Sequence, residues 1–146
     1  MGNQADVEKM IHYTFGNAKY LEEAMTAAGT SSSNNGPGKD NGNKRLALVG
    51  DALIRLIILD EWYPEGTSTE KGSNLVSSRG SNQNLNEIGA ECGFSRYIKL
   101  NPCQKGAAPP TTMASTVEAI IGAVWEDSGK DLDRVRGVVR ALHLTE

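Results

Sequence analysis

The residues of this chain that are best placed for chemistry lie in two apolar segments, 43–53 and 114–123. In the first segment and just after it, four positions spaced by three, four and four residues share one face of a helix. In chain order these positions hold Lys44, Ala47, Asp51 and Arg55. In the second segment, Ser115 and Glu118 stand one helical turn apart. Carboxylates that project from rigid helices onto one spot are the ligands that Mg²⁺ prefers, and Asp51 and Glu118 are the carboxylates among these positions.

The same acids also have structural interpretations. Asp51 and Arg55 have the order and spacing of an i, i+4 helix salt bridge. The stretch from Ser115 to Glu118 fits a Ser-x-x-Glu capping box, although Met113 already belongs to the apolar stripe of that helix, which favours an earlier start. Three hypotheses therefore stand side by side: a buried ion pair joining Asp51, Arg55 and Glu118, an intact metal site, and exposed charges without a role.

Hydrophobic periodicity predicts an all-α fold, because no segment carries a β-hairpin signal. Two short helices are expected within 4–28, and a central helix that is buried on most sides is expected over 46–62. The remaining helices are predicted at 73–92, 111–127 and 131–142, with a short extended or turned segment at 97–100. The stretch 29–42 is rich in Ser, Asn and Gly and is expected to be a mobile surface loop, because it has little to bury.

Length and composition indicate one globular domain, 1–146, with 38% hydrophobic and 23% charged residues. No apolar run is long enough to span a bilayer and no signal peptide is visible, so an intracellular protein is expected. Cys92 and Cys103 are too few for a metal cluster or a disulfide framework; two free thiols are expected, with a single bridge as the alternative. The net charge of −3 weighs against a simple nucleic-acid binder, but an acidic metal site would itself add negative charge.

Two sequence runs together resemble the signature helices of the ribonuclease III family: NKRLALVGDAL at 43–53 and ASTVEAIIGA at 114–123. The segment Val7–Phe15 resembles the opening of the family's domain, and the likeness extends to Leu142. The resemblance implies an all-α ribonuclease III-type domain that forms a homodimer through its first signature helix. Leu48 occupies the position of the apolar residue that enters the partner. Few residues follow Leu142, so the double-stranded RNA-binding domain common in the family is expected to be absent.

The resemblance also implies a site. In the family, carboxylates from both signature helices bind Mg²⁺ or Mn²⁺, which activates water for cleavage of double-stranded RNA. Position by position, the family's first Glu falls on Lys44, its second Glu on Ala47 and its second-helix Asp on Ser115, whereas Asp51 and Glu118 are retained. Two of the four core acids are therefore missing. A further family Glu falls near Glu70, within one residue of register.

The leading hypothesis is a homodimeric domain associated with the binding or processing of double-stranded RNA, in which metal-dependent hydrolysis is lost or weak. One alternative is an active Mg²⁺-dependent endoribonuclease that uses Asp51, Glu118 and a further acid such as Glu70. Another alternative is a structural subunit of a ribonucleoprotein, such as a mitochondrial ribosome. No membrane partner and no small-molecule substrate are expected.

Overall fold

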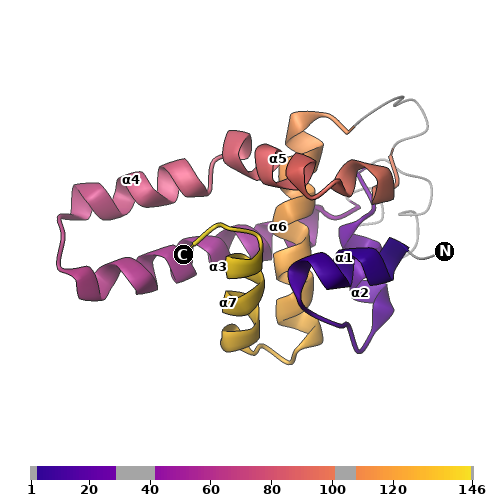
Figure 1. The fold of residues 1–146 in the computed structure, drawn as a ribbon, viewed down its shortest axis with the longest axis horizontal. Helices are drawn as coiled ribbons and strands as arrows, with labels where there is room; N and C mark the ends of the chain where they lie inside the picture. The colour runs from indigo at the N-terminus through magenta and orange to yellow at the C-terminus, as the bar shows by residue number, and fades with distance from the viewer. Residues whose placement is uncertain (1–2, 29–41, 101–107, 146) are drawn as a thin grey trace.

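The computed structural model describes residues 3–28, 42–100 and 108–145, and within these ranges the fold is all-α, as predicted (Figure 1). Its helices are α1 (Asn3–Ile11), α2 (Ala18–Ala24), α3 (Lys44–Trp62), α4 (Thr69–Arg79), α5 (Asn82–Glu91), α6 (Pro110–Asp127) and α7 (Leu132–Ala141), with the 3-10 helices η3 (Tyr63–Glu65) and η4 (Phe94–Tyr97). Extended backbone pairing in these ranges is limited to an isolated bridge between Thr26 and Lys99. This bridge confirms the extended or turned segment predicted at 97–100, except that Tyr97 is the last residue of the 3-10 helix η4.

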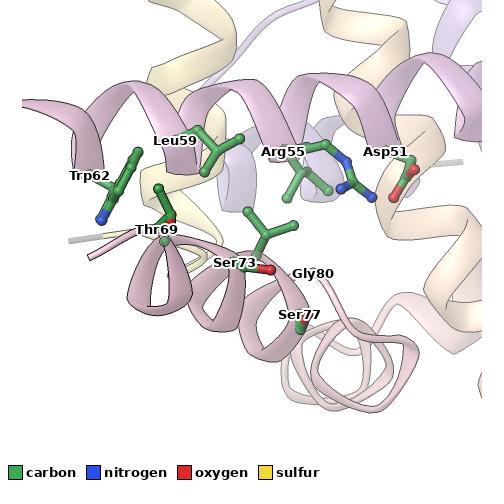
Figure 2. Close-up of a pocket in the computed structure, with 11 residues that line it drawn as sticks. Asp51, Arg55, Leu59, Trp62, Thr69, Ser73, Ser77 and Gly80 are labelled. Carbon is green, nitrogen blue, oxygen red and sulfur yellow. The ribbon is translucent and has the colours of Figure 1, made fainter. Parts of the chain in front are cut away.

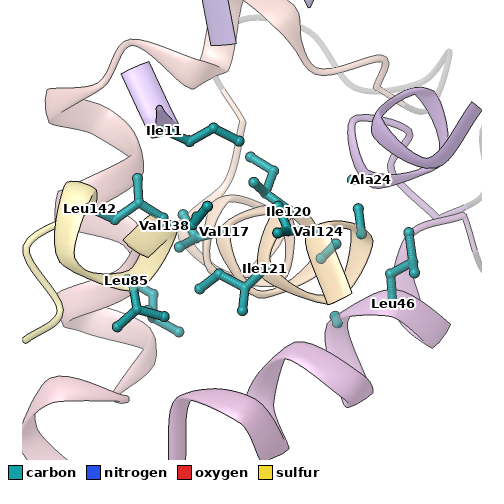
Figure 3. Packing of buried hydrophobic residues seen from close by; sticks show 14 of the residues in the cluster. Ile11, Ala24, Leu46, Leu85, Val117, Ile120, Ile121, Val124, Val138 and Leu142 are labelled. Atoms are coloured by element: carbon teal, nitrogen blue, oxygen red, sulfur yellow. The ribbon is translucent and has the colours of Figure 1, made fainter. Parts of the chain in front are cut away.

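Helix α6 is the centre of the hydrophobic core. Its apolar residues point in all directions and are almost all buried, because α2, α3, α5 and α7 pack around it. Figure 3 shows Leu85 of α5, Val138 of α7 and Leu142, the C-cap of α7, on the side of α6 that carries Val117 and Ile121. Each fully buried Ile, Leu or Val contributes about 1.5–3 kcal/mol relative to an exposed position, so this cluster supplies most of the apolar stabilisation.

Helices α3 and α6 cross at unusually short range, and glycines make the crossing possible. A Cβ atom added at Gly50 would collide with the backbone carbonyl of Glu118, and one added at Gly122 would collide with the carbonyl of Leu46. Both glycines belong to the two motifs picked out from the sequence. Their role is therefore steric: they let two helix backbones touch, which fixes α3 and α6 in one register.

Helices α3 and α4 form an antiparallel hairpin that extends away from the other helices (Figure 1). The turn between them contains Gly66 in the left-handed region, at φ 70°. The indole nitrogen of Trp62 donates a hydrogen bond of 2.6 Å to the hydroxyl of Thr67. Helix α4 then returns past the same indole, where a Cβ atom at Gly72 would lie 2.7 Å from the ring. The hairpin is thus closed at its tip by Trp62.

The prediction of one helix over 73–92 is wrong, because the structure has two helices there, α4 and α5. The break falls at Gly80 and Ser81. The Ser81 hydroxyl accepts a hydrogen bond of 3.1 Å from the backbone N–H of Asn84, which makes Ser81 the N-cap of α5. The Asn84 amide in turn donates to the carbonyl of Arg79 at the end of α4, over 2.6 Å. The hydrogen bond from Asn84 therefore satisfies a terminal carbonyl of α4, and the Ser81 cap satisfies a free N–H at the start of α5.

The prediction that the central helix is buried on most sides is also wrong for the chain as described. Helix α3 leaves one long face open, where Leu48 is 75% exposed and Leu56 is 50% exposed. Tyr63, just after the helix, is 78% exposed. The apolar residues on this face have no partner within the described ranges, because the rest of the core lies on the opposite side of α3, against α6.

Two predictions fall largely on residues that the structure does not describe. The loop predicted at 29–42 lies outside the described residues except for Gly42, and Cys103 also lies outside them. Cys92 is a free, partly buried thiol. Over the ranges described, none of the helices combines the length and the apolar character needed to cross a bilayer.

The segment between α1 and α2 is held to the end of α6 by one carboxylate. Asp127 accepts hydrogen bonds from the Tyr13 hydroxyl at 2.6 Å and from the backbone N–H groups of Gly16 and Asn17 at 2.9 and 2.7 Å. Burial acts to raise the pKa of Asp127, but the hydrogen bonds from Tyr13, Gly16 and Asn17 prevail and lower it. Burial, followed by the bond to Asp127, raises the pKa of Tyr13.

Two glycine substitutions should change stability in opposite directions. Gly50→Ala forces the α3 and α6 backbones apart, and we expect it to lower the free energy of unfolding by about 3 kcal/mol or more. Gly137→Ala is the matched control, because Gly137 lies inside α7 with nothing within 4 Å of an added Cβ atom. It should raise stability by roughly 0.5–1 kcal/mol. Urea unfolding curves would measure both, and equal effects would refute the steric role of Gly50.

Asp127→Asn should lower the free energy of unfolding by about 2 kcal/mol, because it weakens three hydrogen bonds to a charged acceptor. A carboxylate whose pKa is lower in the folded state stabilises the protein above the unfolded pKa, about 3.9, and loses that contribution as the pH falls. The variant should therefore lose part of the acid sensitivity seen below about pH 4. Glu126→Gln is the control, since the Glu126 side chain makes no hydrogen bond or ion pair with any other residue of the ranges that the structure describes. Identical acid unfolding of wild type and Asp127→Asn would contradict the assignment.

Candidate functional site

The crossing of α3 and α6 brings the two candidate acids together. Asp51 lies in the second turn of α3, and Glu118 lies next to the point where Gly50 meets the α6 backbone. The side chains of Asp51 and Glu118 are joined by a hydrogen bond. The two carboxyl groups retained from the family pattern therefore form one pair, built from both signature helices.

The pair shares a proton at neutral pH. Burial, then the hydrogen bond to Asp51 and the negative charge of that residue, raise the pKa of Glu118 to about 8, while the charge of Lys44 acts in the opposite direction. Glu118 is therefore mainly protonated near pH 7 and donates its hydrogen bond to the Asp51 carboxylate. Protonation of Glu118 removes one negative charge from the pair.

Lys44 and Ser115 stand at two positions where the ribonuclease III resemblance calls for acids. The Lys44 ammonium donates a hydrogen bond of 3.1 Å to the Ser115 hydroxyl, which links the first turn of α3 to α6. A cation and a hydroxyl thus occupy the place of two carboxylates. The third replaced position, Ala47, is only 6% exposed and offers no oxygen ligand.

These residues do not fit a tightly held divalent metal. Mg²⁺ and Mn²⁺ need several hard oxygen ligands, usually including more than one ionised carboxylate. Here one carboxyl of the pair is protonated near neutral pH, and an ammonium lies close enough to influence it. Among the residues described, no group of three or more His, Cys, Asp or Glu side chains is arranged to hold a metal ion.

The structure contradicts the hypothesis of a buried ion pair joining Asp51, Arg55 and Glu118. Asp51 and Arg55 are both exposed, and Asp51 is hydrogen-bonded to Glu118 instead. Ion pairs within the described ranges lie elsewhere, at Arg134–Asp131, Arg136–Asp60, Arg136–Glu61 and Arg140–Glu61. The capping-box interpretation also fails, because α6 begins at Pro110 and Ser115 lies inside the helix.

A groove of about 420 Å³ runs between α3 and α4, and Asp51 and Arg55 lie at one end of it. Figure 2 shows both side chains on the side of α3 that faces the groove, with Trp62 at the other end. The groove is lined by Asp51, Ile54, Arg55, Leu59, Trp62, Thr69, Gly72, Ser73, Val76, Ser77 and Gly80. The α4 wall carries three hydroxyl groups at spacings of four residues, which places them along one face of that helix.

Glu70 is not brought to the acid pair within one chain. It is an exposed residue in the first turn of α4, beside Thr69, which lies at the Trp62 end of the groove (Figure 2). Eleven residues of α3 separate Trp62 from Asp51, which corresponds to about 16 Å along the helix axis. The antiparallel return of α4 therefore places Glu70 far from Asp51.

Asn43 has a positioning role that its sequence pattern does not predict. Its side chain is 1% exposed, and its amide donates to the carbonyl of Ala24 at 2.9 Å and to the hydroxyl of Thr116 at 3.1 Å. The Thr116 hydroxyl donates in turn to the carbonyl of Thr112. Asn43 therefore ties α2, α3 and α6 together beside Lys44. The available signal was an Asn placed immediately before a long apolar helix, a position usually interpreted only as a cap.

Comparison with known proteins shows what the chain is similar to. A family model described as Ribonuclease-III-like matches residues 17–143. The chain is 33% identical over 137 residues to ribonuclease 3 of Pseudoalteromonas translucida and 32% identical over 136 residues to ribonuclease 3 of Vibrio vulnificus. Each alignment covers 90% of this chain and 56% of the relative, so the chain spans about half the length of these proteins.

The fold is also shared with a solved structure. The nuclease domain of ribonuclease III from Campylobacter jejuni, described for flexibility in a region involved in dimer formation, matches with a TM-score of 0.82 at 20% identity. The match covers 94% of this chain and 93% of that one. The family model spans most of the chain, including both helices that carry the acid pair. The chain therefore belongs to the ribonuclease III family.

Proposed function

We propose that this chain is a ribonuclease III-like domain that associates with double-stranded RNA and in which metal-dependent phosphodiester hydrolysis is lost or weak. The observation that carries this proposal is the hydrogen bond from Lys44 to Ser115 beside the Asp51–Glu118 pair. An ammonium, a hydroxyl, a buried methyl group and a protonated carboxyl stand where hydrolysis calls for a cluster of ionised acids.

The charges at this site oppose metal-dependent hydrolysis. Hydrolysis of a phosphodiester by water at neutral pH needs a deprotonated nucleophile and compensation of the negative charge that develops in the transition state. To hold a divalent ion at neutral pH, Glu118 would have to lose its proton below its raised pKa of about 8, and the ion would have to approach Lys44. Both steps oppose metal binding. The retained pair can still offer one or two oxygen ligands, which is why weak activity belongs to the proposal.

Association with double-stranded RNA and homodimerisation are the other parts of the proposal. The relatives named above are ribonucleases, and the Campylobacter jejuni structure concerns a region involved in dimer formation. In this chain, Leu48, Leu56 and Tyr63 make an open apolar face along α3 and its end. A contiguous apolar face on a soluble domain is typical of a subunit interface, and a second copy of α3 would cover it.

The cleavage prediction is that the wild-type protein cuts long double-stranded RNA far more slowly than Vibrio vulnificus ribonuclease 3, with Mn²⁺ supporting more activity than Mg²⁺. Its dissociation constant for Mg²⁺, measured by calorimetry, should be higher than about 1 mM. The triple substitution Lys44→Glu, Ala47→Glu and Ser115→Asp should tighten metal binding, because it replaces a cation, a methyl group and a hydroxyl with carboxylates. Asp51→Ala is the background control. Efficient wild-type cleavage that Glu118→Ala abolishes would show that the enzyme is active.

The dimer prediction concerns Leu48. At micromolar concentration the wild-type protein should sediment as a two-fold species, and Leu48→Glu should sediment as a monomer because it places an unpaired charge at the centre of the interface. Ala5→Glu adds the same charge at an exposed position on α1 and should leave the dimer intact. A wild-type monomer would refute the homodimer, and a dimeric Leu48→Glu variant would refute the role of Leu48.

A further inference from the structure

We infer that Lys44 and Arg55, which share one face of α3 by their spacing in the sequence, form a metal-independent binding site on that face for the phosphate backbone of double-stranded RNA. The inference rests on the proposed association with double-stranded RNA and identifies the residues that make the contact. The acids that remain in the site do not fit a tightly bound metal ion. Cationic side chains of the protein are therefore the source of positive charge that can bind the RNA phosphates.

Lys44 is held in position and still has donors to offer. Its ammonium uses one N–H on the Ser115 hydroxyl at 3.1 Å, and the side chain is exposed. An ammonium has three N–H donors and no acceptor. Within the described ranges no salt bridge occupies the other two donors. The bond to Ser115 fixes the direction of a flexible side chain, which reduces the entropy lost when Lys44 binds an anion.

Arg55 is a second cation on the same side of α3. It lies on the helix face that also carries Asp51, and it lines the groove between α3 and α4 (Figure 2). In the part of the chain that the structure describes, no carboxylate lies within ion-pair distance of its guanidinium. A guanidinium offers five N–H donors in a planar fork, a geometry that matches two oxygens of a phosphate.

The spacing of the two cations suits two phosphates and not one. Eleven residues separate Lys44 from Arg55, or about 16 Å along the helix axis. Asp51 lies between them and repels a phosphate placed directly over it. Each cation therefore acts on its own phosphate, on either side of the carboxyl pair, and the two contacts should be separable by mutation.

The opposite wall of the groove adds neutral donors. Thr69, Ser73 and Ser77 of α4 face the groove, and a hydroxyl can donate to a phosphate oxygen or exchange hydrogen bonds with a ribose 2′-hydroxyl. The three hydroxyls lie along the same groove as Arg55, so a strand bound at Arg55 would meet them. Shape and backbone contacts of this kind recognise double-stranded RNA without reading its sequence.

The test is a salt titration of binding to a short blunt-ended double-stranded RNA, followed by fluorescence anisotropy in the presence of EDTA. The wild-type protein should bind under these conditions. Lys44→Ala and Arg55→Ala should each reduce the slope of log K against log salt concentration by about 0.9, and each should weaken binding roughly fivefold at 0.15 M salt. Lys44→Arg keeps the charge and should retain the wild-type slope.

The control is Lys9→Ala, which removes an exposed cation from α1, a helix that packs against α7. Circular dichroism would verify that every variant is folded. If Lys44→Ala and Arg55→Ala behave like Lys9→Ala while the wild type binds in EDTA, the site is wrong although the association with RNA stands. Binding that appears only with added Mg²⁺ would also overturn the inference. If the wild type binds no double-stranded RNA at all, both the site and the proposed function fail.

Discussion

The close crossing of α3 with α6 is the constraint on which the rest of this structure depends. Gly50 and Gly122 allow the two backbones to touch, and no side chain can be inserted at either point without moving a helix. This contact sets the register of α3 against α6, and with it the distance between Asp51 and Glu118 and between Lys44 and Ser115. Asn43 adds a second tie from α2 to the same junction. The position of every candidate site residue follows from a steric fit.

The charges gathered at this junction compensate one another without a metal. A cluster of ionised carboxylates in a partly buried site repels itself, and a bound cation normally offsets that repulsion. In this chain the number of acids is lower, one of the remaining two holds a proton, and Lys44 supplies a positive charge from the protein itself. These features reduce the repulsion that a bound cation would otherwise have to offset.

Much of this architecture could be predicted from the sequence, and the failures have physical causes. The apolar stripe of α6 and the long apolar run of α3 indicated both helices, because periodic burial is a local signal. The break at Gly80–Ser81 could not be predicted, because the sequence does not distinguish a Ser inside a polar helix from a Ser at an N-cap. The difference depends on the backbone conformation at that residue. At the site, the positions of Asp51 and Glu118 were anticipated from the family pattern. The Lys44–Ser115 bond and the protonation of Glu118 were not, because they depend on which helix faces come within 3–4 Å, and that is decided by the glycine contact.

The burial of Ala47 bears on how this sequence could change over evolutionary time. The position is closed, at 6% exposure, and it lies on the face of α3 that carries Asp51. A lone reversion to Glu would add a carboxylate beside a pair that already shares a proton, with too few partners to hold a compensating ion, and an unpaired buried charge is costly. A lone reversion of Ser115 to Asp would gain a salt bridge with Lys44 and still leave that cation in place. Introducing the four acids one residue at a time would therefore pass through variants that carry an unpaired buried charge or that keep Lys44 beside the new carboxylate.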